Sequence, residues 1–202
     1  MDNKIKVLVG VDLQNDFIDG SLANKEAQAV IDNIVEKIRN FDGDAMFFTL
    51  DTHFSDYLQT NEGKMLPVEH CLYGTEGWEL NEKIVVDAID YKISKGMKVV
   101  FIPKPTFGSV EGILSLSSSY PYTSLVNEIL NLEAGNTSPV PMDIEMFGFC
   151  TDICVVSNAL ILKAFTHDFA DIYVDSSCCA GVTQQKHEAA LEVMRSCQIN
   201  VI

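Results

Sequence analysis

One stretch of the sequence places a cysteine where its thiol could act as a nucleophile. Residues 148–155 read Gly-Phe-Cys-Thr-Asp-Ile-Cys-Val, between an apolar strand pattern and an apolar helical pattern. Cys154 therefore falls in the first turn of an expected helix, where backbone N–H groups and the helix dipole favour the thiolate. The alternative is that Cys154 is a small buried apolar residue without a chemical role.

Two charged residues elsewhere in the chain could activate this thiol. Asp12 directly follows the apolar run 6–11, and Lys104 follows the apolar run 98–102. A nearby carboxylate can accept the thiol proton, and a nearby ammonium lowers the pKa of the thiol and stabilises developing negative charge. Together with Cys154 they predict attack on a carbonyl carbon. The alternatives are a capping role for Asp12 and a solvated surface position for Lys104.

A second group of residues has the chemistry of a metal site. Asp51 and His53 end another apolar run, and residues two apart at a strand end project to the same side. A carboxylate and an imidazole suit a divalent transition metal such as zinc. His70 could be a third ligand and Glu62 a fourth, both from the long segment 54–78. The alternative is local hydrogen bonding by these side chains.

The elements that must position these residues alternate along the chain. Short apolar runs typical of buried strands are separated by amphipathic helical patterns, which predicts an α/β fold with a parallel sheet and helices on both faces. Ligands bind such folds at the carboxyl ends of the strands. Five of the reactive residues fall at or just after such ends and would share one rim: Asp12, Asp51, His53, Lys104 and Cys154. We expect strands at 6–11, 45–50, 98–102, 142–147, 170–174 and 200–202, and helices at 25–41, 80–95, 124–132, 154–167 and 186–197.

Some segments carry further expectations. The strand at 142–147 contains two acidic residues, which indicates a partly polar face or a subunit boundary. The helix at 154–167 is apolar nearly all round, so we expect it to be deeply buried. His167 and His187 fall on helical patterns away from the rim and are interpreted as structural. The apolar helix and the short last strand favour a homo-oligomer.

Composition limits the classes of protein and partner. The chain has 202 residues, of which 47% are hydrophobic and 21% charged, as expected for a single globular domain over 1–202. A net charge of −15 argues against nucleic acid and anionic membranes as partners. No signal peptide and no apolar run of membrane-spanning length is visible, so we expect a cytoplasmic protein with reduced thiols.

Motifs spread over nearly the whole chain resemble those of the isochorismatase-like cysteine hydrolase superfamily, and within it the nicotinamidases. The resemblance implies a three-layer, doubly wound sheet of six parallel strands and a catalytic triad of Asp12, Lys104 and Cys154. The matching segments are residues 11–17 (VDLQNDF), 51–53 (DTH), 67–77 (PVEHCLYGTEG), Lys104 with Phe107, and 148–155 (GFCTDICV).

The same resemblance assigns further roles. It implies a cis peptide bond between Phe149 and Cys150 that aims the N–H groups of Cys150 and Cys154 at an oxyanion. It implies a metal, above all zinc, that is held by three residues of the second group, with Glu62 or a residue near Ser55 as the less certain fourth ligand. The three are Asp51, His53 and His70.

The substrate expected from the resemblance is nicotinamide, a small carboxamide, hydrolysed through a thioester on Cys154. Phe17 could form an apolar wall for it. Nicotinamidases commonly place a tryptophan before the loop proline and histidine, and here residues 65–70 contain no aromatic, so Trp78 or Phe107 would have to replace it. The alternatives are a family hydrolase for another small amide or a vinyl ether, a zinc hydrolase with a structural cysteine, and a non-catalytic interaction protein.

Overall fold

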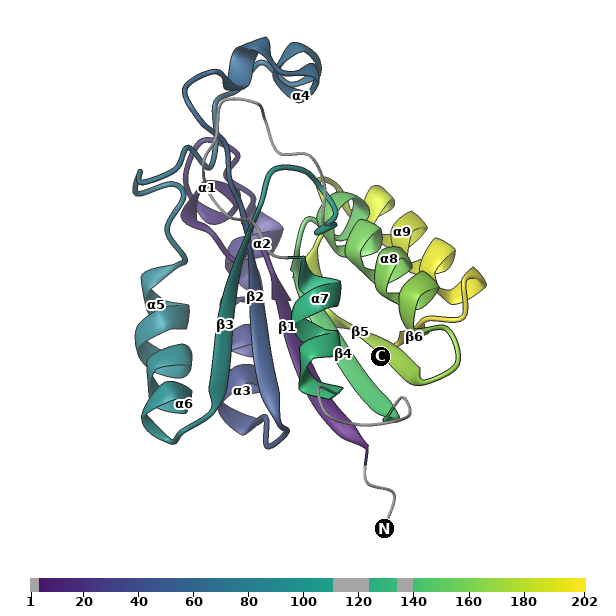
Figure 1. Cartoon of the computed structure of the whole chain (residues 1–202). Coiled ribbons are helices and arrows are strands. Elements are labelled where there is room, and N and C mark those ends of the chain that lie inside the picture. The colour runs from purple at the N-terminus through teal and green to yellow at the C-terminus, as the bar shows by residue number, and fades with distance from the viewer. Residues whose placement is uncertain (1–3, 111–123, 134–139) are drawn as a thin grey trace.

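Six strands form one parallel sheet in the order β3-β2-β1-β4-β5-β6 (Figure 1). The structure is a computed structural model and describes residues 4–110, 124–133 and 140–202. The strands are β1 (Ile5–Val11), β2 (Ala45–Asp51), β3 (Lys98–Lys104), β4 (Met142–Phe149), β5 (Ala170–Ala180) and β6 (Asn200–Val201).

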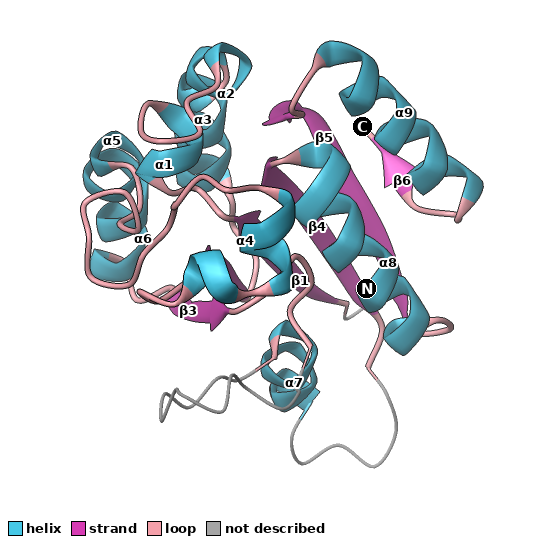
Figure 2. Ribbon diagram, turned by 90° about the horizontal axis from the view of Figure 1, so that it is seen from above, coloured by secondary structure: helices cyan, strands magenta, loops and turns pink. Residues whose placement is uncertain are grey.

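Helices cover both faces of this sheet. Segments α3, α5 and α6 pack on one face and α7, α8 and α9 on the other, as right-handed crossovers between parallel strands require (Figures 1 and 2). The doubly wound α/β fold is therefore confirmed. The helices are α1 (Asn15–Ile18), α2 (Lys25–Ala29), α3 (Ile31–Asn40), α4 (Asn61–Met65), α5 (Glu82–Ile84), α6 (Asp90–Ser94), α7 (Leu125–Leu130), α8 (Val156–Thr166) and α9 (Gln184–Ser196), with short 3-10 or π turns η1 (Tyr57–Gln59), η2 (Val85–Ile89), η3 (Asn131–Glu133) and η4 (Thr151–Val155).

Strand register brings the reactive residues together at one edge. In the β2–β3 pair Asp51 lies opposite Lys104, and in the β1–β4 pair Val11 lies opposite Gly148. All of β2 is buried, as expected for a central parallel strand covered on both faces. The carboxyl ends of the strands lie at the top of Figure 1, below α4. The register of the strands alone thus brings the residues of the predicted rim to one edge of the sheet.

Three segments differ in detail from the patterns in the sequence. The expected helix over 25–41 is divided at Val30 into α2 and α3, and the helix over 80–95 contains the π turn η2. The long segment 54–78 holds η1 and α4 rather than loop alone. The sequence also predicts a Gly- and Ser-rich loop over 106–122 and a connection over 133–139, and most of these residues lie outside the described ones.

The acidic residues of β4 are paired within the chain. Asp143 lies 2.8 Å from the Lys4 ammonium, and Glu145 pairs with Lys37, which also pairs with Asp175. The polar face of this strand therefore needs no subunit boundary to explain it.

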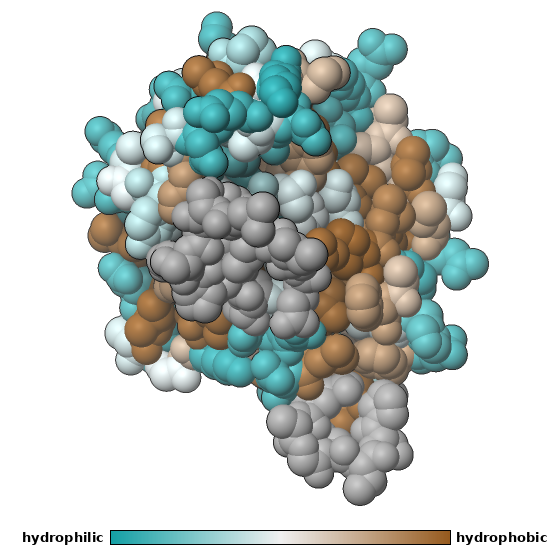
Figure 3. Space-filling model, turned by 45° about the horizontal axis from the view of Figure 1, so that its top comes forward, coloured by the Kyte–Doolittle hydropathy of each residue, from teal (hydrophilic) through white to brown (hydrophobic). Residues whose placement is uncertain are grey.

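The expectation of a deeply buried helix after β4 is wrong for α8. Its inner side chains, such as Ala159 and Leu162, are buried, but Phe165 is 57% exposed and Leu160 is only partly buried. Figure 3 shows hydrophobic side chains gathered on one side of the surface. The helix is apolar because one side packs on the sheet while the other carries half-buried apolar groups. Within the described residues, no helix has the length and apolar character needed to cross a membrane.

Candidate active site

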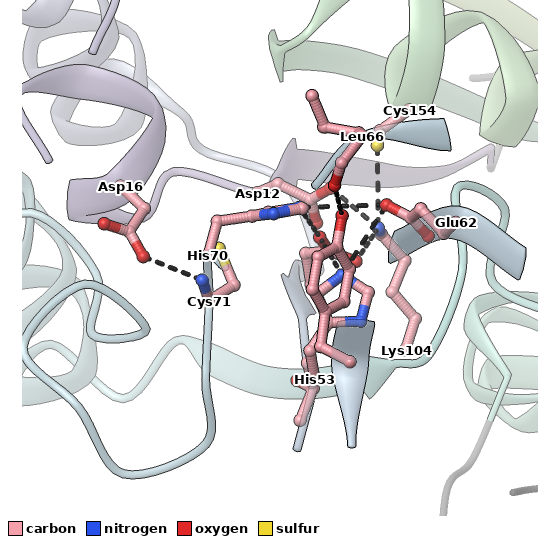
Figure 4. Close-up of polar contacts among 12 residues, drawn as sticks. Asp12, Asp16, His53, Glu62, Leu66, His70, Cys71, Lys104 and Cys154 are labelled. Carbon is pink, nitrogen blue, oxygen red and sulfur yellow. Dashed lines mark hydrogen bonds and ion pairs between the residues drawn. The ribbon is translucent and has the colours of Figure 1, made fainter. Parts of the chain in front are cut away.

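The thiol, the ammonium and the carboxylate of the predicted triad meet at the rim. The Lys104 Nζ atom lies 2.7 Å from Asp12 Oδ2 and 3.6 Å from Cys154 Sγ (Figure 4). All three residues are buried. They come from the ends of β1 and β3 and from η4, which the parallel sheet brings to one place. The structure thus places the three residues within reach of one another.

Burial dominates the titration of this group. Burial raises the pKa of the Cys154 thiol well above its ordinary value, and the Asp12 and Asp51 carboxylates act in the same direction against Lys104. The expectation of a lowered thiol pKa is therefore wrong, because desolvation outweighs the ammonium and the helix start. Burial also raises the pKa of Asp12, although Lys104 opposes it. A thiol with a raised pKa thus lies beside a carboxyl group whose pKa is also raised, and the Lys104 ammonium opposes both shifts.

The backbone at Asp12 is unusual and tightly held. Its φ of 51° lies in the left-handed region, which aspartate tolerates better than most residues. The Thr49 hydroxyl donates a 2.7 Å hydrogen bond to Asp12 Oδ1, while Oδ2 faces the Lys104 ammonium at 2.7 Å. Both oxygens of the carboxyl group are therefore held in place.

The predicted metal ligands form one cluster. Asp51 Oδ2 lies 3.0 Å from His53 Nε2 and 3.4 Å from His70 Nε2, and Glu62 Oε1 lies 3.7 Å from both histidine nitrogens. Burial acts to raise the pKa of Asp51, but Lys104 and the two histidines outweigh it and hold that pKa well below its usual range. Burial raises the pKa of Glu62, and the Asp51 carboxylate adds to this effect. Two carboxylates and two imidazoles therefore share one partly shielded space.

The spacing of these donors fits a metal ion. All four donor atoms lie within 4.8 Å of one another. Ligands about 2.0–2.1 Å from a tetrahedral zinc stand roughly 3.3–3.4 Å apart. The distances between the carboxylate oxygens and the histidine nitrogens are 3.0, 3.4, 3.7 and 3.7 Å, on either side of that value. Two nitrogen and two oxygen donors also suit zinc and its neighbours in the first transition series. The residues present thus fit the metal that the sequence predicts, with Glu62 as the fourth member.

Two residues to which the sequence assigned no role support this cluster. The Gln14 amide donates to the Asp51 carbonyl at 2.9 Å and accepts from the Asp51 N–H at 2.7 Å. The Asp16 carboxylate accepts the Cys71 N–H at 2.7 Å, next to His70 (Figure 4). Both belong to the matched segment 11–17, so the motif itself was the available signal, but a backbone contact cannot be read from a sequence.

The turn before Cys154 has a special backbone. The Phe149–Cys150 peptide bond is cis, the conformation that the resemblance implied. Gly148 has a φ of 124°, and a side chain there would meet the Val11 carbonyl oxygen at 2.1 Å. A glycine is therefore required where β4 passes β1 so closely.

One histidine lies nearer this turn than expected. His187 Nδ1 is 2.9 Å from the buried Thr151 hydroxyl, so His187 supports the turn rather than lying away from it. The strand–helix spacing could not show this, because the contact depends on how α9 packs against η4. His167 is exposed and pairs with Asp168 at 2.9 Å.

A cavity of about 430 Å³ opens onto the thiol and the cluster. Both expected wall residues, Phe17 and Phe107, line the cavity. Leu66 also lines it, and belongs to the segment 65–70, in which this chain lacks the tryptophan that is common in nicotinamidases. Trp78 does not line it and instead donates its N–H to Thr52. Other predicted residues in the lining are Asp51, Glu62, His70, Cys150 and Cys154, whereas Phe149 is buried in the core.

Another missed residue connects the cavity wall to the thiol segment. The buried Asn158 amide donates to the carbonyl oxygens of Phe107, at 3.0 Å, and Cys154, at 2.8 Å. Its carbonyl oxygen accepts the Ser109 N–H at 2.8 Å. Asn158 thus ties the segment after β3 to the helix that follows the thiol.

Comparisons with known proteins agree with this geometry. The model of the isochorismatase domain matches residues 6–109 and 132–202. A Bacillus subtilis (strain 168) protein described as an uncharacterized isochorismatase family protein, PncA, is 27% identical in an alignment 191 residues long that covers 92% of this chain and 92% of that one.

Two solved structures share the fold. The nicotinamidase SaPncA from Staphylococcus aureus is 26% identical with a TM-score of 0.65, over 100% of this chain and 99% of that one. The pyrazinamidase of Pyrococcus horikoshii, in complex with zinc, is 24% identical with a TM-score of 0.71, over 98% of both chains. The domain match over most of the sequence shows that this chain belongs to the isochorismatase family.

Proposed function

We propose that this family member is a metal-containing cysteine amidohydrolase that converts nicotinamide to nicotinate and ammonia. The observation that carries the proposal is that one cavity is lined by the Cys154 thiol and by donors of the four-residue cluster. A thiol and a metal bound to the four-residue cluster, in one cavity, would suit a substrate with a carboxamide at one end and a basic ring nitrogen at the other.

The reaction begins with proton transfer from Cys154 to Asp12 as the sulfur attacks the amide carbon. The backbone N–H groups of Cys150 and Cys154 hold the developing oxyanion. The amide nitrogen takes the proton from Asp12 and leaves as ammonia, and a thioester remains. A water molecule, activated by Asp12, then attacks the thioester carbon and releases nicotinate, while the proton returns to the thiol.

Lys104 keeps charge balanced throughout these steps. Its ammonium faces Asp12, Asp51 and Cys154, so it stabilises negative charge wherever that charge moves among them. When bound to the four-residue cluster, a zinc ion would supply a Lewis-acid contact for the pyridine nitrogen and so orient the ring. Phe17 and Phe107 would then confine the ring between apolar walls.

The names of the structural relatives support nicotinamide, because they include a nicotinamidase and a zinc-bound pyrazinamidase. The alternative is another small amide or a vinyl ether. The observation in its favour is that Leu66, not an aromatic residue, forms part of the wall. We further propose that the protein is cytoplasmic and forms a homo-oligomer. Sedimentation of the purified protein tests the oligomeric state, and cell fractionation tests the location.

Ammonia release from nicotinamide, measured with and without a chelator, tests the proposal. We expect ammonia in stoichiometric yield with nicotinate, loss of activity after chelation, and recovery with added zinc. Turnover of nicotinamide that persists in metal-free protein would contradict the role of the cluster. Absence of ammonia from the zinc-loaded protein would contradict the substrate.

A further inference from the structure

Two lysines line the same cavity without a role in the proposed chemistry. Lys25 and Lys186 are both exposed at its mouth, and neither has an acidic partner within the described residues. Lys104 differs, because it is enclosed between Asp12 and Asp51. In a chain of net charge −15, these two ammonium groups stand without acidic partners at the mouth of a cavity whose lining also holds the carboxylates of Asp51 and Glu62.

A hydrogen bond joins the two segments that carry these lysines. The Asn24 amide donates to the Gly181 carbonyl at 2.8 Å, which joins the start of α2 to the connection between β5 and α9. Lys25 is the first residue of α2, and Lys186 lies in the first turn of α9. Figure 2 shows this connection beside α2. The two ammonium groups are therefore carried by segments that are tied together.

The same connection is anchored to the turn that carries Cys150. The Val182 N–H donates to Asp152 Oδ1 at 2.8 Å, two residues after the cis peptide bond. The position of Lys186 is thus linked to the position of the thiol segment. Such coupling suits a residue that orients a substrate, because orientation depends on a fixed distance between the two sites.

The wall between the lysines and the four-residue cluster is mostly apolar. Leu22, Ile153 and Val182 line it together with Phe17 and Phe107. The cluster comes from β2 and the segment around α4, whereas the lysines come from α2 and α9. A ligand that reaches from one set to the other would meet the four-residue cluster, the thiol and two cations.

We propose that the preferred substrate is a small heteroaromatic carboxamide that carries a second, anionic group such as a carboxylate. Lys25 and Lys186 bind that anion while the carboxamide lies at Cys154. This inference rests on the proposed function for the reaction at the thiol and names another carboxamide, of which nicotinamide is the analogue without the anionic group, as the preferred substrate. The bond broken is the same amide bond, and the second carboxylate leaves the reaction unchanged.

Three amides and a set of variants test the proposal. The zinc-supplemented protein is assayed with nicotinamide, with 5-methylnicotinamide as a neutral control of similar bulk, and with 5-carbamoylpyridine-3-carboxylate. We expect the anionic amide to have the highest kcat/KM, with a KM that rises with salt. Its kcat/KM relative to nicotinamide should fall about fivefold in Lys25→Gln or Lys186→Gln, as for loss of one partly exposed ion pair, and further in the double variant.

Two control variants separate charge at this mouth from charge in general. Lys25→Arg keeps the cation and should keep the preference. Lys98→Gln removes an exposed lysine at the amino end of β3, outside the cavity lining. It should leave kcat/KM unchanged for both nicotinamide and the anionic amide. An unchanged preference in the double variant Lys25→Gln/Lys186→Gln would overturn the inference.

A binding measurement gives a result even where turnover fails. Calorimetry with pyridine-3,5-dicarboxylate, whose carboxylates are too far from the ring nitrogen to chelate a metal in solution, should give weaker binding to the double variant than to the wild type. Equal affinities would overturn the inference whether or not nicotinamide is hydrolysed. Turnover of the anionic amide without turnover of nicotinamide would instead overturn the proposed substrate and leave this inference standing.

Discussion

Lys104 Nζ lies 3.2 Å from Asp51 Oδ1, so one buried ammonium joins the thiol to the cluster of metal-type donors. The same nitrogen lies 2.7 Å from Asp12 Oδ2. Register explains the arrangement, because Lys104 and Asp51 are directly opposite each other on β3 and β2. The pKa of Lys104 is raised well above its ordinary value because the neighbouring acids outweigh its burial. The residue therefore stays charged at neutral pH.

Replacing this lysine should destabilise the fold. Lys104→Met leaves Asp12 and Asp51 as buried carboxylates without their shared cation, which costs about 3–5 kcal/mol. Urea unfolding of the metal-free protein measures the change. The double variant Lys104→Met/Asp12→Asn removes one of the two orphaned charges and should recover part of the loss. Wild-type stability in Lys104→Met would contradict the importance of this charge network.

Two thiols line the cavity, and only one should be the nucleophile. Cys154→Ala should lower kcat by at least about a thousandfold, as for loss of a covalent nucleophile. Cys150→Ala is the matched control, since its thiol also lines the cavity, and it should retain most activity and still be inactivated by iodoacetamide. If Cys154→Ala remains active, the zinc hydrolase with a structural cysteine becomes the better account.

The acid limb of the pH profile should report Asp12. Burial raises the pKa of this carboxyl, and it must be ionised to accept a proton, so activity is present above that pKa and lost as the pH falls through it. The Thr49 hydroxyl bonds to the ionised form and lowers the pKa of Asp12. Thr49→Val should therefore move the acid limb of kcat/KM to higher pH.

Thr49→Ser is the matched control, because it keeps the hydroxyl and should keep the wild-type profile. Initial rates across the acid range measure both variants. A shift of the Thr49→Val limb to lower pH would show that another group controls it.

Gln14 should govern metal affinity without being a ligand. Its side chain holds the backbone of Asp51 from both sides, and loss of such supporting contacts commonly weakens metal binding about tenfold or more. Competition for zinc with a fluorescent chelator measures the change in Gln14→Ala. Gln28→Ala is the control. It removes a glutamine of α2 whose side-chain amide donates to the Ile18 carbonyl, and this variant should bind zinc normally. Equal affinity in both variants would exclude a supporting role for Gln14.

The fold could be predicted largely because buried parallel strands have a simple signature. The runs at 6–11 and 45–50 contain few polar residues, and both became central strands. The strand-end rule then brought Asp12, Asp51 and Lys104 together without knowledge of contacts. Helix burial was less predictable, because the apolar pattern of α8 does not reveal which side is left without a covering element.

The site was harder to predict wherever it depends on backbone contacts or on the balance of opposing forces. Gln14 and Asn158 act through carbonyl and N–H groups that no side-chain pattern announces. The pKa of Cys154 depends on whether burial or the Lys104 charge is larger, and the two have opposite signs. A sequence can place the charge next to the thiol, but it cannot measure how much water reaches either group.

The most direct test of the central claim is intact-mass analysis of the zinc-loaded enzyme quenched with acid during turnover of nicotinamide. We predict a nicotinoyl adduct on the wild-type protein, mapped to Cys154 by peptide analysis and absent from Cys154→Ala. A slow thioester would also give a burst of ammonia before steady turnover. Full nicotinamide turnover by Cys154→Ala, or an adduct mapped to Cys150 instead, would contradict the account.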